Sequence, residues 1–165
     1  RRRSSRWWAR RPGAAPAPVR LGTRLFTRDV PQVKHTGLFA SLRQRRAAQI
    51  DGYDDALFRG VDGRVSEGPT WNIGFVDGGG VVWPQAPRLR GVTARLVERA
   101  AEALGVPVST RPIAASASTR MAGAFVTNAT TGVRRVSAID GVHLPRSALV
   151  ERLADAYAAL PCEAL

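Results

Sequence analysis

Short strand-like runs alternate with amphipathic helical stretches along this chain, and that alternation limits the possible folds most narrowly. The stretch "TWNIGFVDGGGVVWP", residues 70–84, holds two apolar runs around a glycine-rich turn at 77–80, which predicts a β-hairpin. Residues 91–105 then carry apolar side chains at helical spacing, namely Val92, Leu96, Val97, Ala100, Ala101 and Leu104. Interspersed strands and helices predict the mixed α/β class.

The same patterns predict the other elements. A helix is expected over residues 37–50, where apolar positions recur among polar ones until Gly52. Residues 55–68 indicate a strand, a turn at Asp62-Gly63 and a second short strand. Pro145 can open a last helix with Leu149, Leu153, Ala156 and Leu160 facing inward. Further strands are predicted within residues 19–30, 106–113, 123–129 and 133–144.

Length and charge indicate one domain with a basic arm. The chain has 165 residues and a net charge of +12, and such a basic charge raises the question whether the chain binds nucleic acid. Residues 1–30 hold nine arginines and one acid, so +8 of that charge lies there and +4 elsewhere. We therefore expect a basic arm and linker at residues 1–16, a domain at residues 17–165, and no nucleic-acid partner for the domain.

Cysteine usage and hydropathy point to the cytoplasm. Cys162 is the only cysteine, so the sequence has no disulfide framework. No apolar run approaches the roughly 18 residues of a membrane span, and we expect no membrane partner. Histidines and carboxylates do not occur at metal-ligand spacing, so no metal is expected.

Two residues are candidates for chemistry. Of the 25 lysine and arginine residues, only Lys34 is a lysine. A guanidinium stays protonated, whereas an amine can become a nucleophile, so Lys34 is a candidate reactive group. Glu67 follows a turn in "GRVSEGPTWN" and is a candidate acid. The alternatives are a lysine left over by chance in an arginine-rich chain and an isolated surface glutamate.

Two short stretches could hold a phosphate. Residues 90–93, "RGVT", place unpaired N–H groups and the Thr93 hydroxyl at the start of the helix expected over 91–105. Residues 127–132, "TNATTG", follow an apolar strand with small polar side chains. An ordinary capped helix and an ordinary loop are the alternatives. A lysine, an acid and two phosphate sites are together the parts that hold pyridoxal 5'-phosphate.

Four stretches occur in a recognisable order: "VKH", "GYDDALFRGVDGRVSEGPTWNIGFV", "LRGVTARLVERAAEALGVPV" and "AGAFVTNATTGVRRVSAIDG". In these stretches the chain resembles the fold-type IV pyridoxal-phosphate enzymes, the class IV aminotransferases. The resemblance implies the C-terminal large domain of that fold, a mixed sheet or pseudo-barrel with packed helices. It implies a homodimer that binds pyridoxal 5'-phosphate and transfers an amino group between an amino acid and a 2-keto acid.

The resemblance also implies roles for individual residues. Lys34 would form the Schiff base with the cofactor in a desolvated pocket and later move protons. Glu67 would bond the pyridine nitrogen, with its ionised form favoured by the pyridinium, and Asn72 would lie nearby. Backbone N–H groups of Val92 and Thr93, with the Thr93 hydroxyl, would hold the phosphate. The second phosphate contact would be at Asn128 and Ala129.

Departures from the family pattern leave three functions open. Phe39 stands where branched-chain enzymes carry a tyrosine, and Asn128-Ala129 stands where they carry Gly-Thr. Together with "KH", this resembles aminodeoxychorismate lyase, which forms 4-aminobenzoate and pyruvate from aminodeoxychorismate. The family also has a smaller N-terminal domain that contributes a phosphate-binding arginine, and residues 1–30 are too few to form it. A truncated, inactive domain with a polyanion-binding arm is the third expectation.

Overall fold

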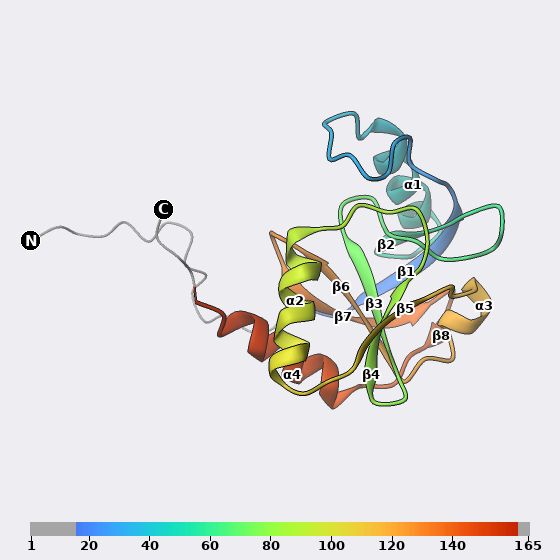
Figure 1. Cartoon of the computed structure of the whole chain (residues 1–165). Coiled ribbons are helices and arrows are strands. Elements are labelled where there is room, and N and C mark those ends of the chain that lie inside the picture. Colours follow the sequence, from blue (N-terminus) through green and yellow to red (C-terminus); the bar gives the residue numbers. More distant parts are fainter. Residues whose placement is uncertain (1–15, 162–165) are drawn as a thin grey trace, which may run out of the picture.

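The computed structural model describes residues 16–161, and the arm predicted at residues 1–16 lies almost wholly outside them. The predicted mixed α/β class is confirmed (Figure 1). The strands are β1 (Val19–Leu25), β2 (Asp55–Arg59), β3 (Asn72–Asp77), β4 (Gly80–Pro84), β5 (Val108–Arg111), β6 (Gly123–Asn128), β7 (Gly132–Ile139) and β8 (Val142–His143). The helices are α1 (Phe39–Ile50), α2 (Val92–Ala103), α3 (Ala115–Ser118) and α4 (Ala148–Ala158).

The strands form one mixed sheet in the order β2-β1-β7-β6-β3-β4-β5, with β8 paired to β7. Strand β1 runs parallel to β2 and to β7, and β4 runs parallel to β5. The pairs β7–β6, β6–β3 and β3–β4 are antiparallel. Parallel neighbours need a crossover, which α1 supplies between β1 and β2 and α2 supplies between β4 and β5.

Residues 64–66 connect the two edges of the sheet. Val65 forms a β-bridge with Arg59 at the end of β2, and its N–H donates to the carbonyl of Ile113 just after β5. Arg64 also forms a bridge with Ala114. The second short strand expected after Gly63 is therefore present only as isolated bridges. These bridges bring the sheet edges together as a pseudo-barrel.

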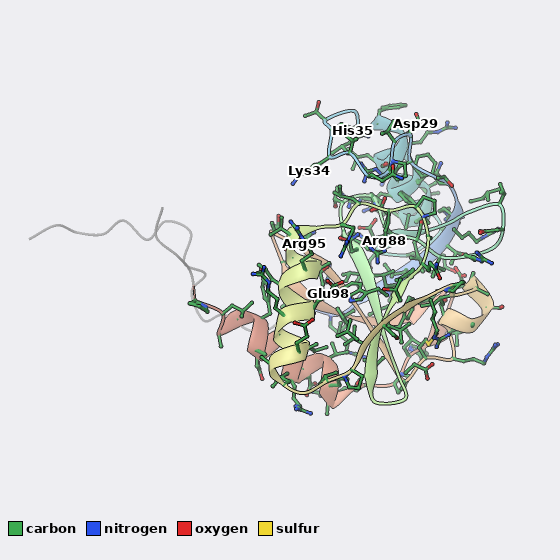
Figure 2. The ribbon with its side chains drawn as sticks, viewed as in Figure 1. Asp29, Lys34, His35, Arg88, Arg95 and Glu98 are labelled. Atoms are coloured by element: carbon green, nitrogen blue, oxygen red, sulfur yellow. The ribbon has the colours of Figure 1, made fainter. Side chains whose placement is uncertain are left out.

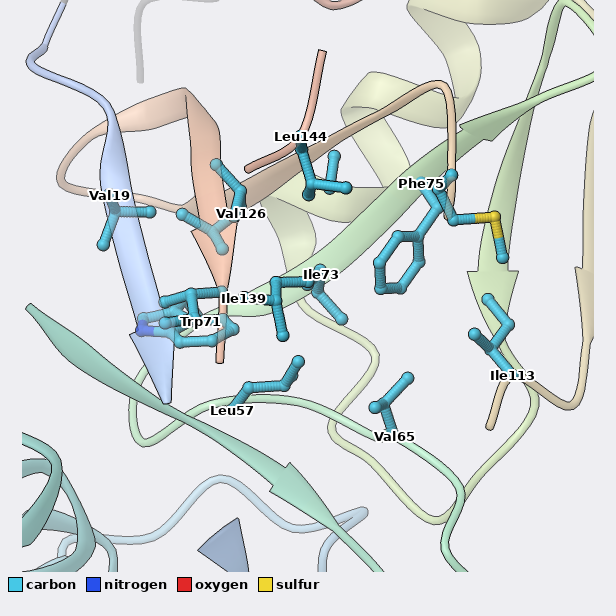
Figure 3. Close-up of a cluster of buried hydrophobic side chains, with 14 of the residues drawn as sticks. Val19, Leu57, Val65, Trp71, Ile73, Phe75, Ile113, Val126, Ile139 and Leu144 are labelled. Carbon is cyan, nitrogen blue, oxygen red and sulfur yellow. The ribbon is translucent and has the colours of Figure 1, made fainter. Parts of the chain in front are cut away.

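The core has two main parts. One fills the inside of the pseudo-barrel, where Val65, Ile113, Leu57, Ile73 and Phe75 pack together (Figure 3). The other lies between the outer face of the sheet and the pair α2 and α4, which cover that face (Figure 1). There the rings of Trp83 and Phe125 meet edge to face with centroids 5.6 Å apart.

Helices α1, α2 and α4 occur where the sequence predicts them, but some of their faces differ. In α2 the buried face contains Thr93 and Ala94, and Val92 is 63% exposed, so its predicted inward position was wrong. In α4 the inward position of Leu153 is confirmed, and Val150 is also buried. Pro145 precedes the helix, which begins after Ser147. The four-residue α3 was not expected.

Candidate functional site

Glu67 lies directly after the segment that connects the sheet edges. It forms a β-bridge with Asn72 at the start of β3, and the Gly68 N–H donates to the Trp71 carbonyl at 3.0 Å. A Cβ at Gly68 would lie only 2.1 Å from the Trp71 ring, so the indole can pack here only against glycine. This tight turn places Glu67 in the interior at 3% exposure.

The carboxylate of Glu67 has two partners. Its Oε2 accepts a hydrogen bond from the Leu89 N–H at 3.1 Å, and its Oε1 lies 3.3 Å from a guanidinium nitrogen of Arg28. Burial raises the pKa of Glu67, while the Leu89 N–H and the Arg28 charge oppose that rise. The sequence indicated neither partner. Arg28 is one of nine arginines in the first thirty residues, and nothing in its spacing distinguishes it.

Asn72 holds the turn that precedes α2. Its Nδ2 donates to the Leu89 carbonyl at 2.6 Å, and its Oδ1 accepts from the Gly91 N–H at 3.1 Å. A Cβ at Gly91 would lie 2.4 Å from that Oδ1, so a side chain there would displace the amide. Glycine in "RGVT" thus permits Asn72 to fix the backbone where the helix begins.

The N-terminus of α2 has donors without helical partners. Gly91 is the N-cap residue, and no side chain caps the helix there. The first turn of an α-helix leaves its N–H groups without intrahelical acceptors, and at α2 these belong to Val92, Thr93 and Ala94. Thr93 is 5% exposed. Such a helix start attracts anions through these donors and through the helix dipole.

Thr127 adds a buried hydroxyl on the sheet face that carries Asn72. Asn72 and Thr127 are direct partners in the antiparallel pairing of β3 and β6, so their side chains share a face of the sheet. The Thr127 hydroxyl is buried and, among residues 16–161, has no hydrogen-bond partner. An orphaned buried hydroxyl is uncommon and needs an explanation.

Lys34 lies on the loop between β1 and α1, and its side chain is exposed (Figure 2). The desolvated pocket expected around its amine is therefore not formed by the described part of this chain. The preceding residue, Val33, is tied to the acid, because its carbonyl accepts a hydrogen bond from Arg28 at 3.1 Å. Arg28 thus contacts both Glu67 and the loop that carries Lys34.

Asn128 is the last residue of β6, and Ala129 lies in the turn between β6 and β7. The Asn128 Oδ1 accepts from the Thr130 N–H, the Thr131 N–H and the Thr131 hydroxyl, so this side chain stabilises its own turn. A cavity of about 310 Å³ opens beside it, with walls that include Arg45, Asp55, Thr70, Trp71 and Arg134. Neither Lys34 nor Glu67 lines that cavity.

Comparison with known proteins identifies the family. The sequence model of the family described as amino-transferase class IV matches residues 16–139, which include every site residue predicted above. The chain belongs to the class IV aminotransferase family. The family resemblance inferred from the four sequence stretches is confirmed.

Individual members show the range of this family. A probable branched-chain-amino-acid aminotransferase of Rickettsia felis is 31% identical over 101 residues, which are 61% of this chain and 35% of that protein. The branched-chain aminotransferase of Thermoproteus uzoniensis, solved with norvaline, is 26% identical with a TM-score of 0.80. That match covers 85% of this chain and 50% of the solved one.

A solved lyase is also similar. The putative 4-amino-4-deoxychorismate lyase of Legionella pneumophila is 25% identical with a TM-score of 0.76, over 82% of this chain and 53% of that one. The chain thus spans about a third of the matching curated relative and about half of these solved relatives. Among residues 16–161 we find no helix able to cross a membrane and no cluster of three or more metal-ligating side chains.

Proposed function

We propose that this chain forms the cofactor-binding part of a pyridoxal-phosphate-dependent class IV aminotransferase. The observation that carries the proposal is that hydrogen bonds connect a buried acid, which can bind a cation, to a helix start, which can bind an anion. The buried carboxylate of Glu67 is joined through Leu89 and Asn72 to the start of α2. Thr127, the strand partner of Asn72, adds a buried hydroxyl that has no hydrogen-bond partner among residues 16–161. A cation-binding acid held near an anion-binding helix start suits a ligand with a basic ring nitrogen at one end and a phosphate at the other.

Pyridoxal 5'-phosphate has this form, and when bound it supplies an aldehyde for amines and a ring that accepts electrons. Glu67 would accept a hydrogen bond from the ring nitrogen, because the carboxylate oxygens have lone pairs beyond those used by Arg28 and Leu89. The Val92 and Thr93 N–H groups and the hydroxyls of Thr93 and Thr127 would hold the phosphate. Backbone groups of Asn128 and Ala129, at the end of the same strand as Thr127, would complete that contact. A solved branched-chain amino acid aminotransferase that is 26% identical carries pyridoxamine 5'-phosphate.

Lys34 would provide the reactive amine. With the cofactor bound, its amine would hold the aldehyde end and would serve as the base toward the substrate proton. Because its side chain is exposed here, we infer that another copy of the chain, or a further domain, covers it in the active enzyme. A homodimer in the cytoplasm remains our proposal for that assembly.

Two other functions have their own support. Phe39, the "KH" at Lys34 and the Asn128-Ala129 pair favour an aminodeoxychorismate lyase, and the Legionella pneumophila relative bears that description. An inactive domain with a polyanion-binding arm depends on residues 1–12, which lie outside the described residues. That function predicts steep salt dependence of polyanion binding and its loss when those residues are removed.

A substrate assay separates these functions. The purified protein, loaded with pyridoxal 5'-phosphate, is incubated either with an amino acid and a 2-keto acid or with aminodeoxychorismate. A transaminase produces a new amino acid and a new keto acid, whereas a lyase releases pyruvate and 4-aminobenzoate. We expect transamination with branched-chain amino acids. Release of 4-aminobenzoate without transamination would assign the lyase function, and no product from either mixture would favour the inactive domain.

Thr127→Val tests the proposed phosphate contact independently of the substrate assay. The variant keeps the β-branched shape of threonine but lacks the hydroxyl, so binding of pyridoxal 5'-phosphate should weaken. Binding of pyridoxal, which has no phosphate, should change little. The control is Thr110→Val, at an exposed position in β5, which should alter neither affinity. Equal weakening for both ligands would exclude a phosphate contact at Thr127.

A further inference from the structure

Arg28 lies between the buried acid and the loop that carries the lysine. One of its terminal nitrogens is 3.3 Å from the Glu67 Oε1, and the other donates to the Val33 carbonyl at 3.1 Å. Val33 immediately precedes Lys34. A single planar guanidinium therefore contacts both segments that the proposed chemistry requires.

The burial of this ion pair distinguishes it from the others. The side chains of Arg28 and Glu67 are 6% and 4% exposed, whereas those of Arg20 and Asp54 are 55% and 37% exposed. Solvent and salt weaken exposed pairs. Removing one partner of a buried pair leaves an uncompensated charge and is strongly destabilising. The contact at Arg28 is therefore able to fix the position of its neighbours.

The hydrogen bonds around Arg28 form a continuous series. They lead from the Val33 carbonyl to Arg28, then to Glu67 and the Leu89 N–H. The Leu89 carbonyl continues the series to Asn72 and the Gly91 N–H at the start of α2. Arg28 is the member that joins the loop at residues 29–38 to the rest of the series.

We propose that Arg28 is a positioning residue that couples the loop of Lys34 to the acid at Glu67. The inference rests on the proposed function, because that function gives Lys34 and Glu67 their chemical roles. Its physical basis is that the two terminal nitrogens of a guanidinium have fixed directions, so one contact orients the other. A lysine at this position would keep the charge but could not direct two hydrogen bonds in this way.

Hydrogen exchange on the whole protein without cofactor tests the coupling. Arg28→Lys keeps a cation near Glu67 but loses the directed contact to Val33. Exchange in residues 29–38 should therefore accelerate by about tenfold or more, and exchange in residues 86–91 should stay close to wild type. Arg28→Met removes both contacts and should accelerate both segments. Arg24→Lys, which changes a guanidinium paired with Asp51, is the control and should leave both segments unchanged.

The result in Arg28→Lys decides the inference even if Arg28→Met does not fold. Wild-type exchange in residues 29–38 of Arg28→Lys would overturn the coupling. Borohydride trapping adds a functional readout, since labelling of Lys34 in Arg28→Lys should slow by about tenfold or more, as expected from the loss of a hydrogen bond to a charged group. A wild-type protein that is not labelled on Lys34 would reject the proposed function, and the exchange result would still show whether the two segments are coupled.

Discussion

At the scale of single residues, the site depends on a carboxylate kept in the interior. Burial alone raises the pKa of Glu67 and would favour its neutral form. The guanidinium of Arg28 and the N–H of Leu89 favour the charged form that a pyridinium requires. The sequence indicated Glu67 as a candidate acid, because it lies in a recognisable motif, and its role in binding a cofactor stays a prediction. The sequence did not predict Arg28 or Thr127, because neither burial nor an unused hydroxyl is visible in residue spacing.

Replacing Glu67 by glutamine should change how stability depends on pH. The pKa of Glu67 is raised in the folded state, so the unfolded chain loses this proton first as the pH rises. The free energy of unfolding contributed by Glu67 is therefore fully present below about pH 4.5 and decreases as the pH rises through the folded pKa. Urea unfolding of the cofactor-free protein, with and without Glu67→Gln, measures the difference at several pH values.

The wild-type minus Glu67→Gln difference should become smaller between pH 4 and pH 7. Glu102→Gln, at an exposed position, is the control, and the difference in unfolding free energy that it causes should show no comparable trend with pH. A difference that grows with pH would mean that Arg28 and Leu89 outweigh the burial of Glu67.

At the scale of elements, apolar periodicity predicted the helices and the antiparallel hairpin of β3 and β4. Apolar character is a poorer guide to burial, because α1 buries the polar Ser41 and leaves the apolar Leu42 and Ile50 exposed. The four small residues of α3 carry no periodic signal. The bridge between Arg64 and Ala114 joins residues that lie 50 positions apart along the chain, and local patterns do not encode such pairings.

Truncating the buried leucine of α4 should destabilise the outer helical layer. Leu153 is fully buried among the side chains between the sheet, α2 and α4, and Leu153→Ala should lower the free energy of unfolding by about 2–5 kcal/mol. Leu42→Ala in α1, where the side chain is 41% exposed, is the matched control and should cost much less. Chemical denaturation gives both values. Similar losses in the two variants would contradict the packing of α4 on this layer.

At the scale of the whole molecule, the pseudo-barrel presents Glu67, the start of α2 and the turn after β6 from three separate parts of the chain. The order of the sequence motifs predicted the mixed sheet and the family. Each motif includes a turn or a helix start, where particular residue types are needed and can be recognised in the sequence. The β-bridges and hydrogen bonds of residues 64–66, which we call the closing contacts, were not predictable in detail, although Glu67 follows them directly in the chain.

The closing contacts should be among the most stable parts of the molecule. The Val65 N–H donates to the Ile113 carbonyl inside the core, so its exchange should require opening of the pseudo-barrel. Hydrogen exchange should show protection at Val65 comparable with that of the β3 amides and far above that of Gly78 and Gly79 in the hairpin turn. Rapid exchange at Val65 would show that the sheet edges separate easily.

Covalent trapping tests the assignment of the reactive amine most directly. The protein is mixed with pyridoxal 5'-phosphate, reduced with borohydride and digested, and the modified peptide is identified by mass spectrometry. We predict a phosphopyridoxyl group on Lys34, together with loss of the visible absorbance near the imine band, and neither should occur in Lys34→Ala. An adduct confined to the N-terminal amine, or an equal yield of adduct in Lys34→Ala, would contradict Lys34 as the cofactor lysine.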